Sequence, residues 1–313
     1  MIDVSIVIVC MNNLKNLYPC LESIRKYTVN VKYETLVVAY LFTKENLERV
    51  KADFPWVTFI ESNEIRGFSE NNNLALKKAK GKYCFVLNDD TEMRMSVIEH
   101  LFDTIEKLPE NVAIISPQIV LERTKKILLG KPQYNFGTFL LDNLFLSFLY
   151  KKKSMYINKS GIFQTYNISG AAFLIKKNIF EKIGWFDEKY FFCPEDIALS
   201  TKVNRSGFKC FVDSLAIIYH FSGGTWSKTI GATKPASVKG EFYFYGTNIF
   251  YRIIYILFLT FIFSGKIVYW IINGAITGQP KAITMMVANK NALYSLYSTK
   301  TPKELFQKFY LKK

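Results

Sequence analysis

Two adjacent carboxylates follow an apolar run in the first third of the chain. The run 81–91 reads as a strand that ends in Asn88-Asp89-Asp90. In open α/β sheets, ligands bind beyond the carboxyl ends of the strands, where the connecting loops leave a crevice. Carboxylates at that edge suit a hard divalent cation that keeps positions open for phosphate oxygens. A turn or a helix cap is the structural alternative, because Asp is a favoured cap.

A second acidic pair, Glu195-Asp196, follows an extended Cys193-Pro194 and opens a predicted helix. A carboxylate acts as a general base when it lies within hydrogen-bond reach of a hydroxyl, but acids also favour the first turn of a helix. His220 stands at a predicted strand end, and two glycines that permit close backbone approach to phosphate follow it. A hydrogen-bonded core histidine is the alternative for this residue. The types of these residues therefore indicate metal and acid-base chemistry, and structural roles stay open for each.

Alternating strands and helices are needed to position these residues. Apolar β-branched runs alternate with segments of helical spacing up to residue 108, which predicts βαβ units. The first half predicts strands at 4–9, 33–38, 57–60 and within 81–91, helices at 14–27, 43–52, 74–79 and 97–108, and a polar loop at 63–73. The second half predicts strands at 112–115, 118–121, 169–175, 208–212 and 216–219, and helices at 179–183 and 197–206. The aromatic-rich segment 131–166, which carries Lys151-Lys152-Lys153, breaks the alternation and is interpreted as an insertion that lines a site or touches a surface.

The C-terminal third changes character. Segments 253–265 and 267–280 are apolar and are separated by Lys266. Each has a length more typical of core or interfacial helices than of membrane spans, although together they could form one spanning helix. The tail 300–313 alternates lysine with apolar residues, as basic amphipathic helices do. We expect helices that lie in a membrane surface, with an ordinary packed domain as the alternative.

Charge and cysteine content narrow the class of partner and compartment. The 313 residues include 41 basic and 26 acidic ones, a net charge of +15, which favours anionic partners. The basic residues do not gather in a recognisable nucleic-acid module, so nucleic acid is not expected. Five scattered cysteines indicate neither a disulfide framework nor a zinc site and suit a reducing cytosol. The N-terminus resembles a first strand more than a signal peptide.

Taken in order, the motifs resemble those of a known family. They are Asn12 after the first strand, Arg66-Gly67-Phe68 through Asn73, Gly81-Lys82-Tyr83 before Asn88-Asp89-Asp90, Ser169-Gly170-Ala171, Gly184-Trp185-Phe186-Asp187-Glu188, Glu195-Asp196 and His220. The stretch 4–248 resembles the inverting family 2 glycosyltransferases with the GT-A fold, and within them the bacterial rhamnosyltransferase-like branch that builds surface polysaccharides. The resemblance implies a GT-A (Rossmann-like) mixed α/β sheet flanked by helices at 1–225. The remaining residues, 226–313, would form a helical, membrane-associating extension.

The resemblance also implies a role for each site residue. Asp90 and His220 would bind Mn²⁺ or Mg²⁺, which stabilises charge on the departing diphosphate. Asp196 would be the base that deprotonates the acceptor, with Glu195 beside it. The implied donor-binding residues are Asn12, Tyr40, Arg66, Asn73, Asn88 and Asp89. The implied acceptor-binding residues are Gly170, Ala171 and Trp185.

The implied reaction moves a sugar, rhamnose among the candidates, from a dTDP- or UDP-linked donor to a lipid-linked glycan. The enzyme would sit peripherally on an anionic membrane at the cytoplasmic face of the cell. The chain departs from the family where Cys10-Met11 precede Asn12, where Ala39 replaces an Asp that binds the nucleotide base, and where Ala198 replaces a further Asp. A degenerate, non-catalytic scaffold at the membrane is one alternative. A nucleotidyltransferase is another, although residues 10–13 are not the glycine-rich basic loop that such enzymes want.

Overall fold

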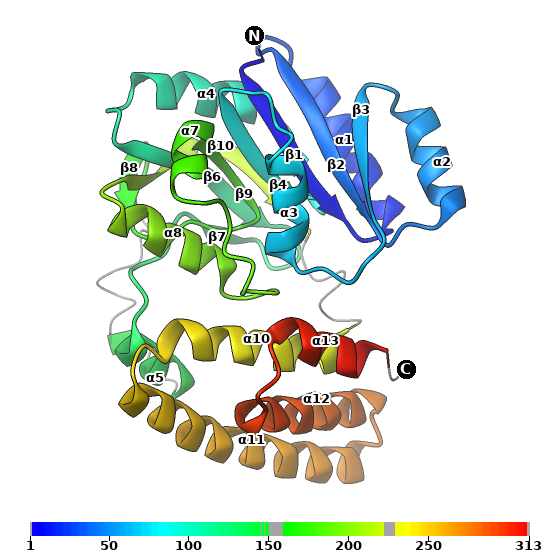
Figure 1. The fold of residues 1–313 in the computed structure, drawn as a ribbon, viewed down its shortest axis with the longest axis vertical. Helices are drawn as coiled ribbons and strands as arrows, with labels where there is room; N and C mark the ends of the chain where they lie inside the picture. Colours follow the sequence, from blue (N-terminus) through cyan, green and yellow to red (C-terminus); the bar gives the residue numbers. More distant parts are fainter. Residues whose placement is uncertain (1, 145, 147, 150–158, 222–228, 312–313) are drawn as a thin grey trace.

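The computed structural model describes residues 2–144, 146, 148–149, 159–221 and 229–311. Lys151-Lys152-Lys153 of the predicted insertion lie outside the described residues. An α/β part stands above a layer of C-terminal helices in Figure 1. The described strands are β1 (Val4–Cys10), β2 (Tyr33–Tyr40), β3 (Val57–Ser62), β4 (Tyr83–Asn88), β5 (Thr91–Met93), β6 (Val112–Leu121), β7 (Lys126–Leu128), β8 (Ile162–Thr165), β9 (Ala172–Lys176) and β10 (Lys209–His220). The described helices are α1 (Leu14–Tyr27), α2 (Lys44–Asp53), α3 (Phe68–Leu76), α4 (Val97–Lys107), α5 (Phe136–Asn143), α7 (Lys177–Lys182), α8 (Glu195–Arg205), α10 (Ile230–Tyr245), α11 (Ile249–Thr277), α12 (Pro280–Tyr297) and α13 (Pro302–Tyr310).

One mixed sheet runs through the α/β part. Its order is β3-β2-β1-β4-β9-β6-β10-β5, with β7 paired to β6 and β8 paired to β10. Strands β1 to β4 pair in parallel, whereas β9 runs antiparallel to both β4 and β6. The predicted mixed sheet flanked by helices is therefore confirmed. The parallel strands place their carboxyl ends at one edge, where Asn88 closes β4.

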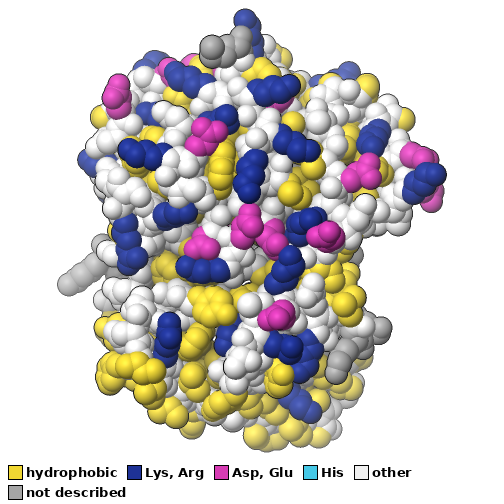
Figure 2. Space-filling view, viewed as in Figure 1, with side chains coloured by type: hydrophobic (Ala, Val, Ile, Leu, Met, Phe, Trp, Pro, Cys, Tyr) yellow, Lys and Arg dark blue, Asp and Glu magenta, His cyan; other side chains and the backbone are white. Residues whose placement is uncertain are grey.

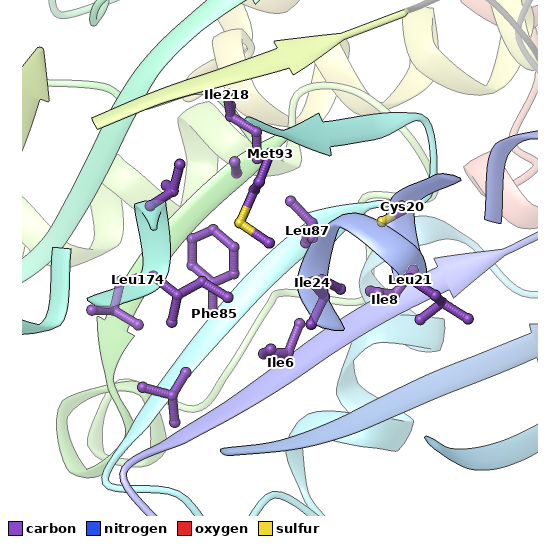
Figure 3. Close-up of a cluster of buried hydrophobic side chains, with 14 of the residues drawn as sticks. Ile6, Ile8, Cys20, Leu21, Ile24, Phe85, Leu87, Met93, Leu174 and Ile218 are labelled. Atoms are coloured by element: carbon purple, nitrogen blue, oxygen red, sulfur yellow. The ribbon is translucent and has the colours of Figure 1, made fainter. Parts of the chain in front are cut away.

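The core under α1 explains why these segments fold as they do. Ile6 and Ile8 of β1 are fully buried, as expected of β-branched residues in a parallel sheet covered on both faces. The apolar side of α1 packs on them, since Leu21 and Ile24 are also fully buried. Figure 3 shows this cluster beneath α1, with Phe85 and Leu87 of β4 beside it. Burying each such side chain contributes about 1.5–3 kcal/mol.

Helix α3 begins earlier than the sequence indicates. The predicted loop at 63–73 is wrong from Phe68 onward, because α3 includes all three asparagines of Asn71-Asn72-Asn73. These side chains are buried. Asn72 donates to the carbonyl of Phe68 at 2.9 Å, whereas Asn71 accepts from Ser62 and Asn73 donates to Phe186. A polar run whose partners lie elsewhere in the folded chain has the composition of a loop. The strands predicted at 112–115 and 118–121 form one continuous strand, β6, and those predicted at 208–212 and 216–219 form β10.

The C-terminal helices pack against the loop that precedes α8. Phe306 of α13 lies between Phe191 and Phe192, with ring centroids 4.7 and 5.5 Å away. On α10, a side chain at Gly240 would come within 2.4 Å of the carbonyl oxygen of Cys193, so only glycine permits this approach. Helix α5 also joins this layer, because Phe139 stacks on Tyr255 of α11. Because α5, from the first 225 residues, packs with the C-terminal helices, the predicted domain boundary at residue 225 stays a prediction.

Helix α11 is one continuous helix of 29 residues, where the sequence suggests two apolar pieces. Among the described residues it is the one helix long and apolar enough to cross a membrane by length and composition, and 17% of its most apolar window is buried. The tail forms α13, a basic amphipathic helix as predicted. Its apolar residues Leu305 and Phe306 are nevertheless buried in the protein, so this side does not face outward.

Candidate active site

Asp90 and His220 meet at the end of the sheet because two short ladders bring them together. Strand β5 runs antiparallel to β10 with Thr91 opposite His220. The N–H of Phe221 donates to the carbonyl of Asp90 at 2.9 Å. As a result, the Oδ1 of Asp90 lies 3.0 Å from the Nε2 of His220, and both side chains are mostly buried, at 13% and 14% exposed. A carboxylate and an imidazole are thus within contact distance of each other at the end of the sheet.

This pair fits the expected divalent metal in its donor chemistry. A carboxylate oxygen and an imidazole nitrogen are ligands that Mn²⁺ accepts, whereas Mg²⁺ prefers oxygen alone. Within the described ranges, no group of three or more His, Cys, Asp or Glu residues could hold a metal. A cation held by Asp90 and His220 would therefore complete its shell from a diphosphate and water, as such cations do in phosphate-handling sites.

Asp89 lies beside Asp90 at the end of β4. Burial, with a smaller contribution from the Asp90 charge, raises the pKa of its carboxyl to about 7, against the hydrogen bond from Cys10 and the charge of His220. Asn88 precedes it, and its N–H donates to the carbonyl of Ala171 at 2.9 Å. This bond joins the end of β4 to the loop before β9, so the two sides of the site share one backbone frame.

Arg66 and Tyr40 form the wall on the β2–β3 side. The Tyr40 hydroxyl accepts a hydrogen bond from the Arg66 N–H at 3.3 Å, and burial raises the pKa of this tyrosine to about 12. Tyr40 is 5% exposed, which leaves little ring surface for the predicted stacking on a nucleotide base. The Arg66 guanidinium donates to Ser62 at 3.2 Å and to Glu64 at 2.7 Å. A cation is therefore fixed at the rim of the site.

Asp196, on the first turn of α8, is held by two donors. Its Oδ2 accepts from the Nζ of Lys131 at 2.9 Å and from the N–H of Gly170 at 3.3 Å. Beside it, the Oε2 atom of Glu195 is buried with no hydrogen-bond partner in the described part of the chain. Burial and the charge of Asp196 raise the pKa of Glu195 well above its usual range. The two acids therefore differ: burial disfavours the charged form of Glu195, whereas Asp196 is paired with a cation.

Lys131 was not predicted as a site residue, although the segment that it opens was expected to line a site. Its backbone makes two hydrogen bonds of 2.9 Å with Asn167, and the hydroxyl of Thr165 donates to its carbonyl. Burial lowers the pKa of Lys131, but the neighbouring Asp196 outweighs this, and the net shift is upward. The only signal for Lys131 in the sequence is its position after the short apolar stretch 127–130. Lysines in such positions are too common for this signal to identify a site residue.

Most of the predicted site residues line one cleft of about 430 Å³. They are Tyr40, Arg66, Asn88, Asp89, Asp90, Gly170, Ala171, Glu195, Asp196 and His220. The Asp90–His220 pair comes from the turn between β4 and β5 and from β10, the acid pair from α8, and the wall from the end of β2 and the loop before α3. Gly170 packs closely here, since an added Cβ would lie 3.3 Å from the Cβ of Asp196.

Three predicted site residues do not line this cleft. Asn12 has a positive φ of 48° and accepts from Asn46, so it shapes the turn after β1. Asn73 is buried on α3 and bonds to the backbone of Phe186 in both directions. Trp185 packs on Phe180 with centroids 5.1 Å apart. In the structure these three side chains shape the protein around the site, and their direct contact with substrate stays a prediction.

Comparisons with known proteins identify a family and a shared fold. The sequence model described as "Glycosyl transferase family 2" matches residues 5–184. No curated protein matches the chain. A crystal structure of GalNAc-T7 with UDP, GalNAc and Mn²⁺ is similar at 18% identity and a TM-score of 0.55; the match covers 70% of this chain and 44% of that one. The mannosyltransferase PcManGT from Pyrobaculum calidifontis, in complex with GDP-Man and Mn²⁺, is similar at 14% identity and a TM-score of 0.53, over 99% of this chain and 86% of that one. Both similarities show a shared GT-A fold, and both structures contain the kind of metal that the sequence predicts.

Proposed function

The chain belongs to glycosyl transferase family 2, and from this premise we propose that it moves a sugar from a nucleoside diphosphate donor to an acceptor hydroxyl with inversion at the anomeric carbon. The observation that carries the proposal is one cleft in which the Asp90–His220 pair and the Asp196 carboxylate come from separate elements. Direct displacement needs these two functions: charge stabilisation at the leaving group and a base for the incoming hydroxyl.

Asp90 and His220 hold the donor half of the site. A divalent ion bound there acts as a Lewis acid toward the diphosphate. Arg66 lies at the rim of the same cleft, already oriented by Ser62 and Glu64, and places a second positive charge near the phosphates. The neighbours named above were solved with UDP and with GDP-Man, which supports a nucleotide-sugar donor.

Asp196 takes the proton of the acceptor hydroxyl. Its Oδ2 is oriented by Lys131 and Gly170, while its Oδ1 accepts only the N–H of the next residue, Ile197, within the described structure. That arrangement orients the carboxylate and leaves lone pairs for a hydroxyl. Burial and the Asp196 charge raise the pKa of Glu195 beside it, which disfavours a second negative charge near a diphosphate.

The donor and acceptor that we propose follow the resemblance of the motifs. The donor is a dTDP- or UDP-linked hexose, with a rhamnosyl donor as the first candidate, and the acceptor is a growing lipid-linked surface glycan. Because Ala39 stands where the family places an Asp toward the base, base recognition has to come from other groups in the cleft, and Met11 lies in its lining.

The test is a thermal-shift screen of dTDP-, UDP- and GDP-sugars with and without Mn²⁺. A ligand that binds only the folded protein at 100 times its Kd stabilises it by about 2.7 kcal/mol. We expect one donor class to raise the Tm only when Mn²⁺ is present, and Asp90→Asn to abolish that gain. Asp103→Asn is the matched control, because Asp103 is an exposed carboxylate on α4. A metal-dependent gain that survives Asp90→Asn would remove Asp90 from the metal site.

A further inference from the structure

Helix α11 presents a broad apolar surface that no described part of the chain covers. Leu257 is 64% exposed and Phe261 is 78% exposed, and Val268 and Ile271 are more than half exposed. These four positions recur at spacings of four, seven and three residues, so they lie on one side of the helix. Figure 2 shows hydrophobic side chains gathered along the lower edge of the molecule, where Figure 1 places α11. Contiguous exposed apolar surface of this kind marks an interaction site.

Helix α12 extends the same surface and adds a basic and aromatic border. Its exposed residues recur every three or four positions: Ile283, Val287, Lys290, Tyr294 and Tyr297. A groove of about 680 Å³ lies along this border, and Lys290, Lys300 and both tyrosines line it. We call Leu257, Phe261, Val268, Ile271, Ile283 and Val287 the apolar face, and Lys290, Lys300, Tyr294 and Tyr297 the border.

The charge distribution identifies what covers this face. Residues 242–303 contain six basic residues and no Asp or Glu, although 26 acids occur in the whole chain. By helical spacing, the two charged residues of α11, Arg252 and Lys266, lie on the side opposite Leu257 and Phe261. An uncharged apolar centre with a border of lysine and tyrosine matches the layers of a lipid surface, in which acyl chains lie below anionic and aromatic-binding headgroups.

We propose that the apolar face inserts into one leaflet of an anionic bilayer, with α11 parallel to the membrane plane and the border at headgroup level. The protein is then peripheral, at the cytoplasmic face of the cell membrane. This placement uses no residue of the catalytic cleft and stands apart from the transfer chemistry.

The other side of α11 explains why the helix lies flat. Tyr255, Leu259 and Phe263 are buried, and the Tyr255 hydroxyl donates to the carbonyl of Val238 on α10 at 2.8 Å. At the far end, Gly274 lies against α12, where an added Cβ would be 3.2 Å from the Cβ of Ala282. A helix that crossed the bilayer would have to leave both partners and expose the buried Glu241 near Tyr255.

The structure also revises which segment reaches the membrane. The sequence assigns the basic tail to the bilayer together with the apolar stretch. Leu305 and Phe306 of α13 are buried against the protein, so the apolar side of this helix is not available to insert. Its lysines remain near the border, where the Nζ of Lys308 lies 3.6 Å from the ring centroid of Tyr294.

Vesicle flotation with the full chain tests the proposal. Vesicles of phosphatidylcholine alone and of phosphatidylcholine with 30% phosphatidylglycerol are the probes. We expect the wild type to float with the anionic vesicles, and Leu257→Ser combined with Phe261→Ser to lower the bound fraction about tenfold or more. The matched control is Val29→Ser with Leu215→Ser, two side chains that are 69% and 58% exposed on the α/β part. This control should float like the wild type.

A second pair of variants separates the border from the apolar face. Lys290→Gln with Lys300→Gln should weaken flotation with anionic vesicles and leave the low binding to neutral vesicles unchanged, because each lysine near such a surface adds about a factor of five in binding. All variants should keep the unfolding midpoint of the wild type and its response to nucleotide sugar. A variant that no longer floats but still responds to nucleotide sugar has lost membrane binding and kept its active site. A variant that floats but no longer responds to nucleotide sugar has a damaged active site and an intact membrane surface.

Three results would overturn the proposal. The first is wild-type protein that floats with neither kind of vesicle. The second is a stable dimer in light scattering that Leu257→Ser with Phe261→Ser converts to a monomer, because the face would then be an interface between copies. The third concerns orientation: a cysteine introduced at Gln279 should react with a membrane-impermeant maleimide in intact vesicles, above the background of the parent. Protection there would mean that α11 spans the bilayer.

Discussion

At the scale of single residues, the ion pair between Asp196 and Lys131 sets the chemistry of the acceptor side. The sequence predicts Asp196 from its place after Cys193-Pro194, because a short local pattern is enough to recognise the start of a helix with acids. Lys131 is 65 residues away in the chain and reaches Asp196 only through the bridge to Asn167. A contact built by an irregular segment leaves no periodic signal. The sequence can therefore single out Asp196, the proposed base, but not its partner Lys131.

Replacing the base should separate binding from chemistry. Asp196→Asn keeps the size and polarity of the side chain and removes the charge that accepts the proton. We expect kcat to fall by about 10²- to 10⁴-fold, while the donor affinity in Mn²⁺ stays within a few-fold of the wild type. Steady-state kinetics and nucleotide titration measure the two quantities. Lost donor binding with a near-normal kcat would place Asp196 in the nucleotide site and make Glu195 the next candidate.

Removing the lysine should act through Asp196. Lys131→Met keeps the length of the side chain but leaves the carboxylate without its cation, which disfavours the ionised form of the acid. The acidic limb of the kcat–pH profile should therefore move to higher pH, and kcat at neutral pH should fall by about 10- to 10²-fold.

Lys131→Arg is the conservative control and should restore the position of the acidic limb. The groups that face this pair are Glu195, Cys193 and Tyr134. Because none of these is changed, a shift of the limb reports the lysine charge. A uniform fall in kcat with an unmoved limb would show that Lys131 only supports the fold.

At the scale of elements, the amphipathic tail shows what a periodic pattern can and cannot predict. The spacing of Leu305, Phe306 and Phe309 predicts a helix with one apolar side, and α13 confirms the helix. The pattern does not say what covers that side. In the structure the cover is the loop 191–192 and helix α10, which are distant in sequence.

This packing gives α13 a structural task that can be measured. Phe306 is 1% exposed and contacts Phe191, Phe192 and Tyr310. Phe306→Ala should lower the free energy of unfolding by about 3–5 kcal/mol, as for other buried phenylalanines. Urea denaturation followed by circular dichroism measures the change. Leu311→Ala, at a side chain that is 69% exposed, should lie within about 0.5 kcal/mol of the wild type. Equal effects of both substitutions would contradict a packed α13.

The regular elements were predicted well where one period dominates, as in α1, whose predicted and observed bounds agree at Leu14–Tyr27. Helix α3 was misjudged because its asparagines are satisfied by partners such as Ser62 and Phe186 that only the folded chain supplies. Strand β9 was predicted, but its antiparallel insertion between β4 and β6 was not, since pairing depends on long-range register.

At the scale of the whole molecule, the net charge of +15 is unevenly spread. The acid-free stretch 242–303 concentrates positive charge in the helical layer, whereas the acids that serve the cleft lie in the α/β part. Our proposals thus assign a different anionic partner to each part: a lipid surface to the helical layer and a nucleoside diphosphate to the α/β part.

Membrane attachment should matter for an acceptor in a bilayer and not for one in solution. With the acceptor lipid held in anionic vesicles, Leu257→Ser combined with Phe261→Ser should lower the transfer rate about tenfold, in line with the fraction of enzyme bound. With a water-soluble acceptor analogue, the same variant should match the wild type, since both residues lie outside the cleft lining. Radiolabelled sugar transfer measures both rates. A deficit with the soluble acceptor would point to a folding defect instead.

The pairing of β5 with β10 also constrains how this site can vary. The distance between Asp90 and His220 follows from a ladder that sets Ile218, Tyr219 and His220 opposite Met93, Glu92 and Thr91. Backbone bonds fix that ladder, so exchanging an outward side chain such as Glu92 leaves the distance unchanged. Adding or deleting one residue in either strand would turn the following side chains to the other face of the sheet. Relatives of this protein should therefore show substitutions in β5 and β10 but almost no insertions or deletions. The number of residues from Asp90 to the end of β5, and from the start of the paired part of β10 to His220, should stay constant.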